Sequence, residues 1–297
     1  MLTFFRQQAR RGCAAVGKKV AADAATALHR RPARSMDEPT VHMLVSSRTW
    51  HAGLLAAVAW EHHTGRRWRF FIHEDGTVDE LARERIRAVL SDVRLVPRTE
   101  ADEKLHAVLS NHPHCLAQRS KHNLFLKFSD FAAFAPGKRF IVLDSDVIFF
   151  RPPAEILEWA DRESDTYHYN EDTKEKFCIP RPYLKEALGV TMWPRFNSGL
   201  VLAPKAAIDW DLAEKLLSVF EQTAHHPQFF EQTLYALMGS AWGRGGALPR
   251  SYEISWGYFR HRGAVCRHYV GAFKHDLLYI EGAPLTLAAM LKKRAGA

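Results

Sequence analysis

Apolar runs and helix-like segments alternate regularly along the chain from Val41 onward. Short apolar stretches, which are typical of strands, are separated by longer stretches whose apolar residues recur every three or four positions, which is typical of helices. We expect strands at 41–47, 67–73 and 92–97, and helices at 49–65 and 78–90. Strands that alternate with helices of this length predict β-α-β units on a parallel sheet.

Residues near the ends of these two helices support the expected boundaries. Thr49 is a suitable N-cap for the first helix, and Gly65 is a suitable C-cap because glycine readily adopts left-handed backbone angles. Thr77 and Glu80 have the spacing of a capping box, so we expect Thr77 to cap the second helix.

A central strand is expected at 138–144, after a mostly helical stretch at 101–137. Its apolar run is continuous rather than alternating, which indicates a strand that is covered on both faces. After a short helix at 154–160, residues 167–199 are rich in proline, aromatic and polar residues, and we expect loops and short strands that face a substrate. Another buried strand at 199–204 precedes helices at 207–225 and 227–239.

The predicted fold class is α/β, a Rossmann-like and mainly parallel sheet flanked by helices, in a single domain at 39–297. Residues 1–38 form a separate basic arm with eight Lys or Arg and three Asp or Glu. We expect this arm to be flexible. Two interpretations of it stay open, a loosely packed leader and a basic amphipathic helix that contacts a membrane surface.

Charge and cysteine content exclude several other classes of protein. The net charge is +8, but +5 of it lies in the arm, and the rest of the chain has no basic patch interleaved with aromatic residues. We therefore expect no nucleic-acid partner. The four cysteines are too widely spaced for a disulfide framework or a zinc site. Without a long apolar segment or secretory signal, we expect a cytoplasmic protein, with contact to the inner face of a membrane left open.

Two aspartates, Asp144 and Asp146, follow the central strand directly. In an open α/β sheet this is the edge where ligands bind. If the segment stays extended, both side chains point to the same side, where a divalent cation would offset their repulsion. The alternative is an ordinary turn in which one aspartate caps backbone amides and the other is solvated.

Four motifs in the chain favour a metal site over an ordinary turn at the two aspartates. They are "LDSDVIFFRPP" at 143–153, "PRFNSGLVLAPK" at 194–205, "FEQTLYALMG" at 230–239 and "HYVGAFKH" at 268–275. Their order and spacing resemble those of the GT-A fold glycosyltransferases of glycosyltransferase family 8, which includes glycogenin and bacterial lipopolysaccharide galactosyl- and glucosyltransferases. The resemblance covers about 41–280. It implies a GT-A fold, a Mn²⁺ or Mg²⁺ cofactor and a nucleotide-sugar donor, most simply a UDP-hexose.

The resemblance also implies a metal site and a diphosphate site. Asp144 and Asp146 match the family's Asp-x-Asp motif, and His268 matches its third metal ligand. Gly271 and Lys274 complete a His-x-x-Gly-x-x-Lys motif, in which the glycine lets the backbone approach the diphosphate and the lysine contacts it.

The other matched positions would bind the donor or act on it. Lys127 would reach the donor sugar or phosphate, although an ion pair with Asp130 on the same helix is an alternative. Asn197 and Ser198 would hydrogen-bond the sugar, with Gly199 making room.

"EQT" at 231–233 matches the family's Asp-Gln pair. Gln232 would support the transition state beneath the anomeric carbon, and Glu231 would orient the reacting groups. Ser46, after the first strand, would lie against the base or ribose. The segment Tyr167 to Asp172 would supply sugar and acceptor contacts, with its Tyr and His side chains stacking on sugar rings.

The sequence therefore predicts a metal-dependent hexosyltransferase that uses a nucleotide sugar and a saccharide or other hydroxyl acceptor, with retention at the anomeric carbon. Two alternatives remain. One is an inverting GT-A enzyme with Glu231 or Asp172 as the base. The other is a non-catalytic protein that binds anionic surfaces through the basic arm. The acceptor and the oligomeric state are not predicted.

Overall fold

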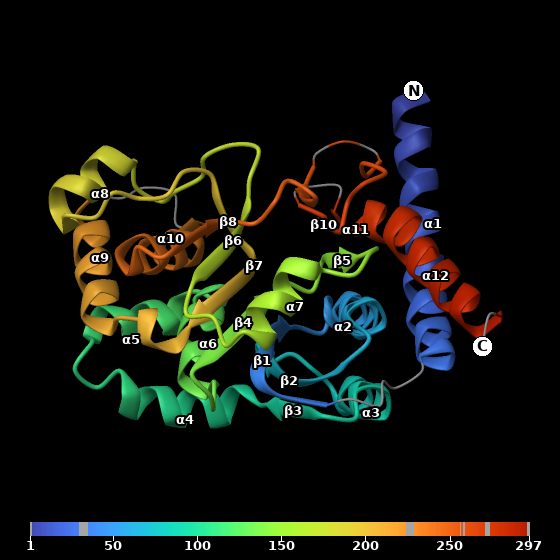
Figure 1. Cartoon of the computed structure of the whole chain (residues 1–297), viewed down its shortest axis with the longest axis horizontal. Coiled ribbons are helices and arrows are strands. Elements are labelled where there is room, and N and C mark those ends of the chain that lie inside the picture. Colours follow the sequence, from blue (N-terminus) through green and yellow to red (C-terminus); the bar gives the residue numbers. More distant parts are fainter. Residues whose placement is uncertain are drawn as a thin grey trace.

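The computed structural model describes residues 2–29, 35–223, 229–255, 257, 259–270 and 274–295. A seven-stranded sheet forms the centre, helices cover both of its faces, and a three-stranded sheet lies at one end (Figure 1). The large sheet has the order β3 (Val93–Val96), β2 (Arg67–Glu74), β1 (Ser35–Val45), β4 (Arg139–Leu143), β7 (Phe196–Pro204), β6 (Tyr167–Glu171), β8 (Gly245–Ala247). The small sheet has the order β5 (Val147–Phe149), β10 (Cys266–His268), β9 (Tyr252–Ile254).

Helices lie on both faces of the large sheet, and the first and last helices of the described residues pack mainly against other helices. In chain order the helices are α1 (Leu2–Leu28), α2 (Trp50–Thr64), α3 (Glu80–Val89), α4 (Arg98–Val108), α5 (Pro113–Lys121), α6 (Phe125–Phe134), α7 (Ala154–Asp161), α8 (Arg181–Leu188), the 3₁₀ helix η1 (Lys205–Ala207), α9 (Trp210–Thr223), α10 (Phe230–Trp242), α11 (Lys274–Leu277), the π-helix η3 (Leu278–Gly282) and α12 (Ala283–Ala295).

Parallel pairing joins β3, β2, β1 and β4, whereas β7 runs antiparallel to both β4 and β6. The sheet is thus mixed and mainly parallel, which confirms the predicted fold class. The expected central position of the strand at 138–144 is also confirmed, since every residue of β4 is buried and the strand is the fourth of seven.

Alternating side chains of the central strands enter two separate cores. On β2, Phe70 packs into the core formed with α2 and α3, and Phe71 packs into the core formed with α4, α6 and α10. On β4, Ile141 and Phe140 divide between the two cores in the same way. This arrangement explains why the apolar runs of these strands are continuous.

The predicted positions of the ends of α2 are confirmed, but neither α2 nor α3 has the threonine cap that the sequence predicts. Gly65 follows α2 with a left-handed φ of 66°. Thr49 precedes α2, but its side chain makes no capping hydrogen bond to the helix, and its hydroxyl accepts from the Ser46 N–H instead. Helix α3 begins only at Glu80, and the carboxylate of Asp79 accepts a hydrogen bond from the Ala82 N–H. Thr77 is instead held in the preceding loop, where its hydroxyl donates to Asp75.

The described part of the predicted arm is mostly helical, and its expected flexibility stays a prediction. Residues 2–28 form α1, and the small side chains of Ala14, Ala21 and Ala25 pack into the core beside α2. Strand β1 begins at Ser35, inside the predicted arm. The division of the chain at residue 38 stays a prediction.

Candidate active site

The site begins at the end of β4, where the chain turns. The Val147 N–H donates to the Asp144 carbonyl over 3.1 Å, so residues 144–147 form a turn rather than an extended segment. The extended geometry that we expected for the two aspartates is therefore wrong. Their side chains converge all the same, because the turn folds Asp144 and Asp146 around a common point.

Strand pairing brings His268 to this turn from a distant part of the sequence. Strand β10 pairs antiparallel with β5, which places His268 opposite Val147. The Tyr269 N–H continues this pairing by donating to the Asp146 carbonyl over 3.0 Å. Backbone hydrogen bonds thus fix the position of the imidazole relative to the aspartates.

One ligand atom from each of Asp144, Asp146 and His268 lies within 4.8 Å of the other two. The His268 Nε2 atom is 3.1 Å from Asp146 Oδ1 and 3.7 Å from Asp144 Oδ2. Adjacent ligands of an octahedral ion with bonds of about 2.1 Å lie about 3 Å apart, so small adjustments would seat a divalent cation here. Two carboxylates and one imidazole are suitable donors for such an ion.

Asn197 determines which nitrogen of His268 faces the carboxylates. Its Nδ2 atom donates to Asp172 over 3.1 Å, and its Oδ1 atom accepts from the Gly199 N–H over 2.9 Å. The same Oδ1 atom lies 2.9 Å from His268 Nδ1. Since an amide oxygen only accepts, Nδ1 carries the proton and the lone pair of Nε2 points toward the aspartates, as a metal ligand requires.

Gly199 allows the imidazole to occupy this position. Its carbonyl accepts a hydrogen bond from the Asp144 N–H over 2.8 Å, so β7 lies directly against the turn. A Cβ atom on Gly199 would lie 2.3 Å from His268 Cε1 and 2.4 Å from Nδ1. The space that we expected Gly199 to leave for a sugar is occupied by the His268 ring.

A buried lysine balances the charge of the site. Lys127 Nζ lies 2.7 Å from Asp144 and 3.0 Å from Glu231. Burial alone would lower the pKa of Lys127, but the two carboxylates raise it above its ordinary value, so the side chain stays charged. The alternative pairing with Asp130 is wrong, because that carboxylate binds Arg119 instead.

Glu231 and Gln232 begin α10 beside this lysine. Burial raises the pKa of Glu231, and the neighbouring Lys127 opposes that shift. The Ser198 hydroxyl donates to the Glu231 carboxylate over 3.0 Å, so this serine faces the protein. Gln232 is buried and its Nε2 donates to the Lys176 carbonyl over 2.7 Å, which fixes the orientation of its amide.

The position of the site follows the rule for open α/β sheets. Chain order reverses between β1 and β4, and ligands bind at the carboxyl ends of the strands that flank such a point. Asp144 follows β4 and Ser46 follows β1, at the same edge. Ser46 is partly buried, and its hydroxyl lies 3.0 Å from that of Thr49 at the start of α2.

A cavity of about 530 Å³ opens beside Asp172. Its lining comes from β6, β9 and the loops next to them, and comprises Glu171, Asp172, Thr173, Arg195, Arg250, Tyr252, Glu253, Ile254, Ser255 and His261. Because Asp172 holds the Asn197 amide, this cavity adjoins the cluster around His268. The sequence predicts Asp172 as the last residue of a segment that contacts sugar and acceptor, and as an alternative base. The contact that it makes with Asn197 across two strands has no local signal in the sequence.

Four residues that the sequence assigns to the site are not seen in it: two lie wholly or in part outside the described residues, and two are buried in the core. Gly271 lies outside the described residues, as does the side chain of Lys274. Tyr167 and Tyr169 are buried, and their hydroxyls donate to the backbone carbonyls of Tyr235 and Pro194. The expectation that these tyrosines stack on sugar rings is wrong, because alternate residues of a covered strand point into its core.

Replacement of Gly199 with alanine should weaken divalent-cation binding without unfolding the protein. The added methyl group would displace the His268 ring. We expect the Mn²⁺ affinity to fall at least about tenfold, as is typical when the residues that orient a metal ligand are changed. Titration followed by the EPR signal of free Mn²⁺ measures this change. Gly263→Ala is the matched control, since nothing lies within 4 Å of its added Cβ. Equal affinities of the two folded variants would contradict the assigned role of His268.

No protein-family model matches the chain, and no curated protein matches it. Several solved structures do. The galactosyltransferase LgtC, crystallised with donor and acceptor sugar analogues, matches with a TM-score of 0.54 and 15% identity over 86% of this chain and 96% of its own.

Two further solved structures match with similar TM-scores and identities. The mouse xyloside xylosyltransferase 1 in its apo form matches with a TM-score of 0.50 and 14% identity, over 77% of this chain and 96% of its own. The bifunctional glycosyltransferase WbbM matches with a TM-score of 0.52 and 14% identity, over 89% of this chain and 53% of its own. The chain therefore has the GT-A glycosyltransferase fold. This confirms the fold that the four sequence motifs predict.

Proposed function

We propose that the protein is a metal-dependent glycosyltransferase that moves a hexose from a nucleotide sugar, UDP-linked, to a hydroxyl group of a saccharide acceptor. The observation that carries this proposal is the convergence of Asp144, Asp146 and His268 at the ligand-binding edge of a GT-A fold. The fold alone is compatible with many activities, so the site has to carry the assignment.

The cation would be Mn²⁺ or Mg²⁺, held by the two aspartates and His268. Bound there, it would neutralise the negative charge that grows on the diphosphate as the sugar departs. The imidazole ligand favours Mn²⁺, because Mg²⁺ prefers an all-oxygen shell. Gly271 and Lys274 would lie along the diphosphate, and Ser46 would lie near the base or ribose.

Lys127 and Asn197 would act mainly by holding other groups in place. Two of the three N–H donors of Lys127 are accounted for by Asp144 and Glu231, which leaves one for the donor substrate. Both ends of the Asn197 amide are bound by protein groups, so we propose that Asn197 positions His268. Ser198 positions Glu231 in the same way.

Gln232 is the residue that we propose to support the transition state, through its amide oxygen, with Glu231 as an orienting neighbour. This assignment corresponds to transfer with retention. An inverting reaction requires a carboxylate that is free to take a proton from the acceptor. Of the two candidates, Glu231 is bound by Lys127 and Ser198, and Asp172 is bound by Asn197. Because both carboxylates already have protein partners, neither is free to act as the base, and this favours transfer with retention.

The acceptor would enter the cavity beside Asp172. That cavity adjoins the metal ligands, and its mixture of carboxylates, arginines and one tyrosine suits a ligand with many hydroxyl groups. The structure of LgtC with sugar analogues at both substrate positions supports a separate acceptor site in this fold.

A nucleotide sugar should stabilise the protein only when a divalent cation is present. At a ligand concentration of about 100 times Kd, binding should raise Tm by about 5 °C. Thermal unfolding with a panel of UDP- and GDP-sugars, with and without Mn²⁺, measures this effect and selects the donor.

The same experiment includes Asp146→Asn, which should abolish the metal-dependent rise in Tm. The matched control is Asp211→Asn, because the Asp211 side chain is exposed at the start of α9, where it pairs with His112 and not with any residue of the site. If Mn²⁺ and nucleotide sugars leave the Tm of the parent protein unchanged, the proposed function is wrong. Salt-sensitive binding to polyanions without any nucleotide effect would instead support the non-catalytic alternative.

Gln232→Ala should lower kcat by about 100-fold and change the donor KM little, because the amide acts chiefly in the transition state. Gln118→Ala is the matched control, since Gln118 is equally buried but lies on α5. Steady-state kinetics gives both constants, and the anomeric proton coupling of the product gives the stereochemistry. An inverted product, or an unchanged kcat, would overturn the assignment of Gln232.

A further inference from the structure

Helix α12 carries an apolar stripe on the side that faces away from the protein. Its inner side is formed by Ala283, Thr286 and Met290, which are buried. The residues exposed on the opposite side are Pro284, Leu285, Ala288, Leu291 and Ala295, apart from the lysines described below. Their spacing of three and four residues places them on one side of the helix. A surface helix normally presents polar residues there, so this stripe requires an explanation.

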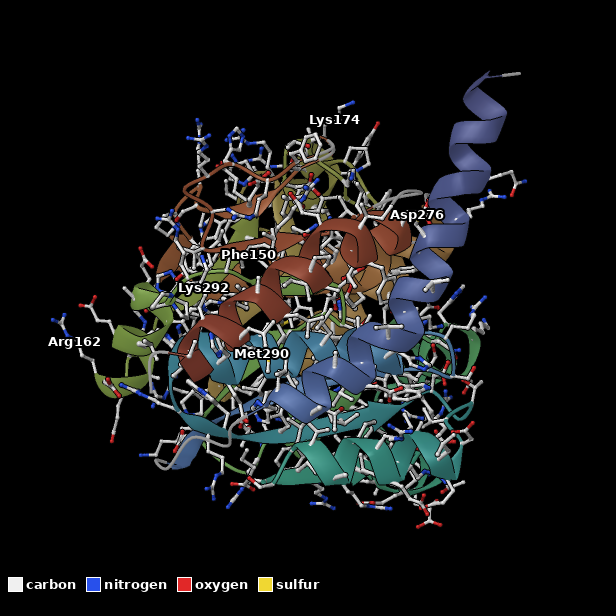
Figure 2. The ribbon with its side chains drawn as sticks, turned by 90° about the vertical axis from the view of Figure 1, so that its right-hand side faces the viewer. Phe150, Arg162, Lys174, Asp276, Met290 and Lys292 are labelled. Carbon is white, nitrogen blue, oxygen red and sulfur yellow. The ribbon has the colours of Figure 1, made fainter. Side chains whose placement is uncertain are left out.

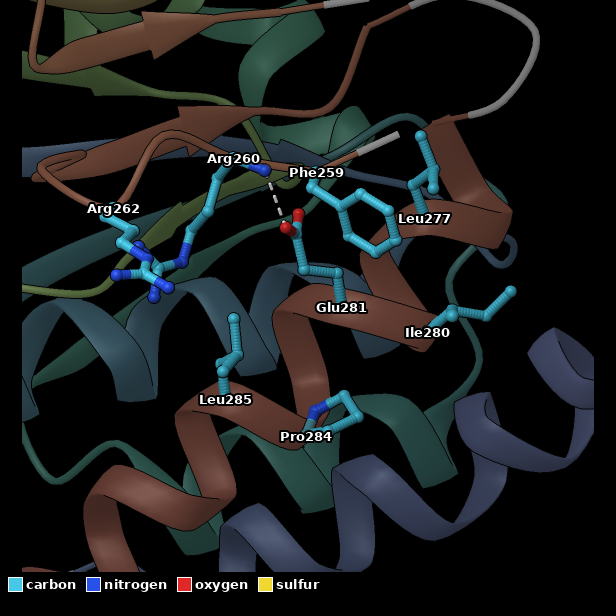
Figure 3. Close-up of a pocket in the computed structure, with 8 residues that line it drawn as sticks. All are labelled: Phe259, Arg260, Arg262, Leu277, Ile280, Glu281, Pro284 and Leu285. Carbon is cyan, nitrogen blue, oxygen red and sulfur yellow. Dashed lines mark hydrogen bonds between the residues drawn. The ribbon is translucent and has the colours of Figure 1, made fainter. Parts of the chain in front are cut away.

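The stripe leads to an apolar cavity of about 530 Å³ (Figure 3). The cavity lies between the loop at 259–262, η3 and the start of α12, and it is lined by Phe259, Arg260, Arg262, Leu277, Ile280, Glu281, Pro284 and Leu285. Phe259 stands at its edge with 82% of its surface exposed. Glu281 adds little free charge, because its carboxylate already binds Arg267 and Tyr269 and accepts from the Arg260 N–H.

Helix α1 extends the same face of the molecule (Figure 2). It packs along α12 and η3, with Gly17 against Tyr279. Val16 and Val20 are exposed on it. Of the ten large hydrophobic side chains that are exposed in the described residues, six lie on α1, the 259–262 loop, η3 and α12: Val16, Val20, Phe259, Ile280, Leu285 and Leu291. We refer to these four elements as the α1–α12 face.

Basic residues accompany the apolar ones on this face. Helix α12 contains three basic residues and no acidic one, and its Lys292 and Lys293 side chains are exposed. On α1 the described basic side chains are Arg11, which is exposed, and Lys18, which is partly buried, and the acidic Asp23 pairs with Arg85. Arg260 and Arg262 flank the cavity beside Phe259. The face therefore combines exposed apolar groups with an excess of positive charge.

A lipid surface fits this combination better than the other possible occupants. A second copy of the chain on the same face would bring like charges together. An acidic peptide or a nucleic acid would match the charge but would leave the stripe on α12 in water. The interface of an anionic bilayer offers both an apolar layer for the stripe and negative head groups for the Lys and Arg side chains.

We propose that the α1–α12 face binds peripherally to the surface of an anionic phospholipid bilayer. Phe259, Leu285 and Leu291 enter the boundary between head groups and acyl chains. Lys292, Lys293 and the arginines beside Phe259 contact the head groups. No helix among the described residues has the length and hydropathy to cross a membrane, so attachment takes place from one side.

This attachment would hold the candidate active site close to the membrane. Residues 259–262 lie in the connection from β9 to β10, and β10 carries His268. The loop that contacts lipid and the strand that carries the third metal ligand are therefore neighbours in the chain. The proposal does not depend on the sugar chemistry, since its test measures lipid binding alone.

Sedimentation with sucrose-loaded vesicles tests the proposal on the full chain. We expect the protein to bind vesicles of 30% phosphatidylglycerol in phosphatidylcholine and to bind pure phosphatidylcholine at least about tenfold more weakly, with the difference reduced by salt. Removal of each lysine charge should lower the partition coefficient about fivefold, so Lys292→Gln with Lys293→Gln should lower it more than about tenfold.

Matched pairs of variants separate lipid contact from general surface effects. Leu291→Glu and Phe259→Ser should lower vesicle binding at least about tenfold. Their controls are Leu124→Glu and Tyr183→Ser on the other side of the molecule, because Leu124 is 50% exposed against 52% for Leu291, and Tyr183 is 61% exposed. Each variant is first checked by its circular dichroism and Tm. Equal vesicle binding by folded variants and controls, or binding independent of anionic lipid, would overturn the proposal.

Discussion

The candidate site depends on two backbone hydrogen bonds that join the end of β4 to strands distant in sequence. The Asp144 N–H binds the Gly199 carbonyl on β7, and the Tyr269 N–H binds the Asp146 carbonyl beside β10. A slip of one residue in either pairing would turn the side chains of that strand to the opposite face. The convergence of two carboxylates and one imidazole is therefore a consequence of strand register, established by folding before any ligand binds.

Buried charge imposes the second constraint on this region. The carboxylates of Asp146 and Glu231 lie out of water together with His268, and ionised groups in such a place require partners. Lys127 supplies the positive charge that Asp144 and Glu231 need, while Asn197 and Ser198 supply hydrogen bonds. Most of the polar residues in the site thus hold one another, which leaves a small number of groups to contact substrate. Preorganisation of this kind is what an electrostatic catalyst requires.

The sequence predicted those features that depend on local pattern. Continuous apolar runs revealed the buried strands, and Gly65 marked the end of α2 because its backbone angle suits glycine. The position of Asp144 at the sheet edge followed from the β-α-β alternation. The sequence could not show that Asp79 rather than Thr77 caps α3, since both residues are good N-caps. It also missed the reason for Gly199, because the His268 ring that fills its space lies far along the chain.

Pulsed EPR of bound Mn²⁺ tests the central claim most directly, which is that Asp144, Asp146 and His268 hold one cation. The electron-spin-echo modulation of the Mn²⁺ complex should contain the coupling of one directly bound imidazole nitrogen. That coupling should disappear in His268→Gln and persist in His261→Gln, which changes a histidine of the neighbouring cavity. A Mn²⁺ complex without nitrogen coupling, or with a coupling that survives in His268→Gln, would contradict the account.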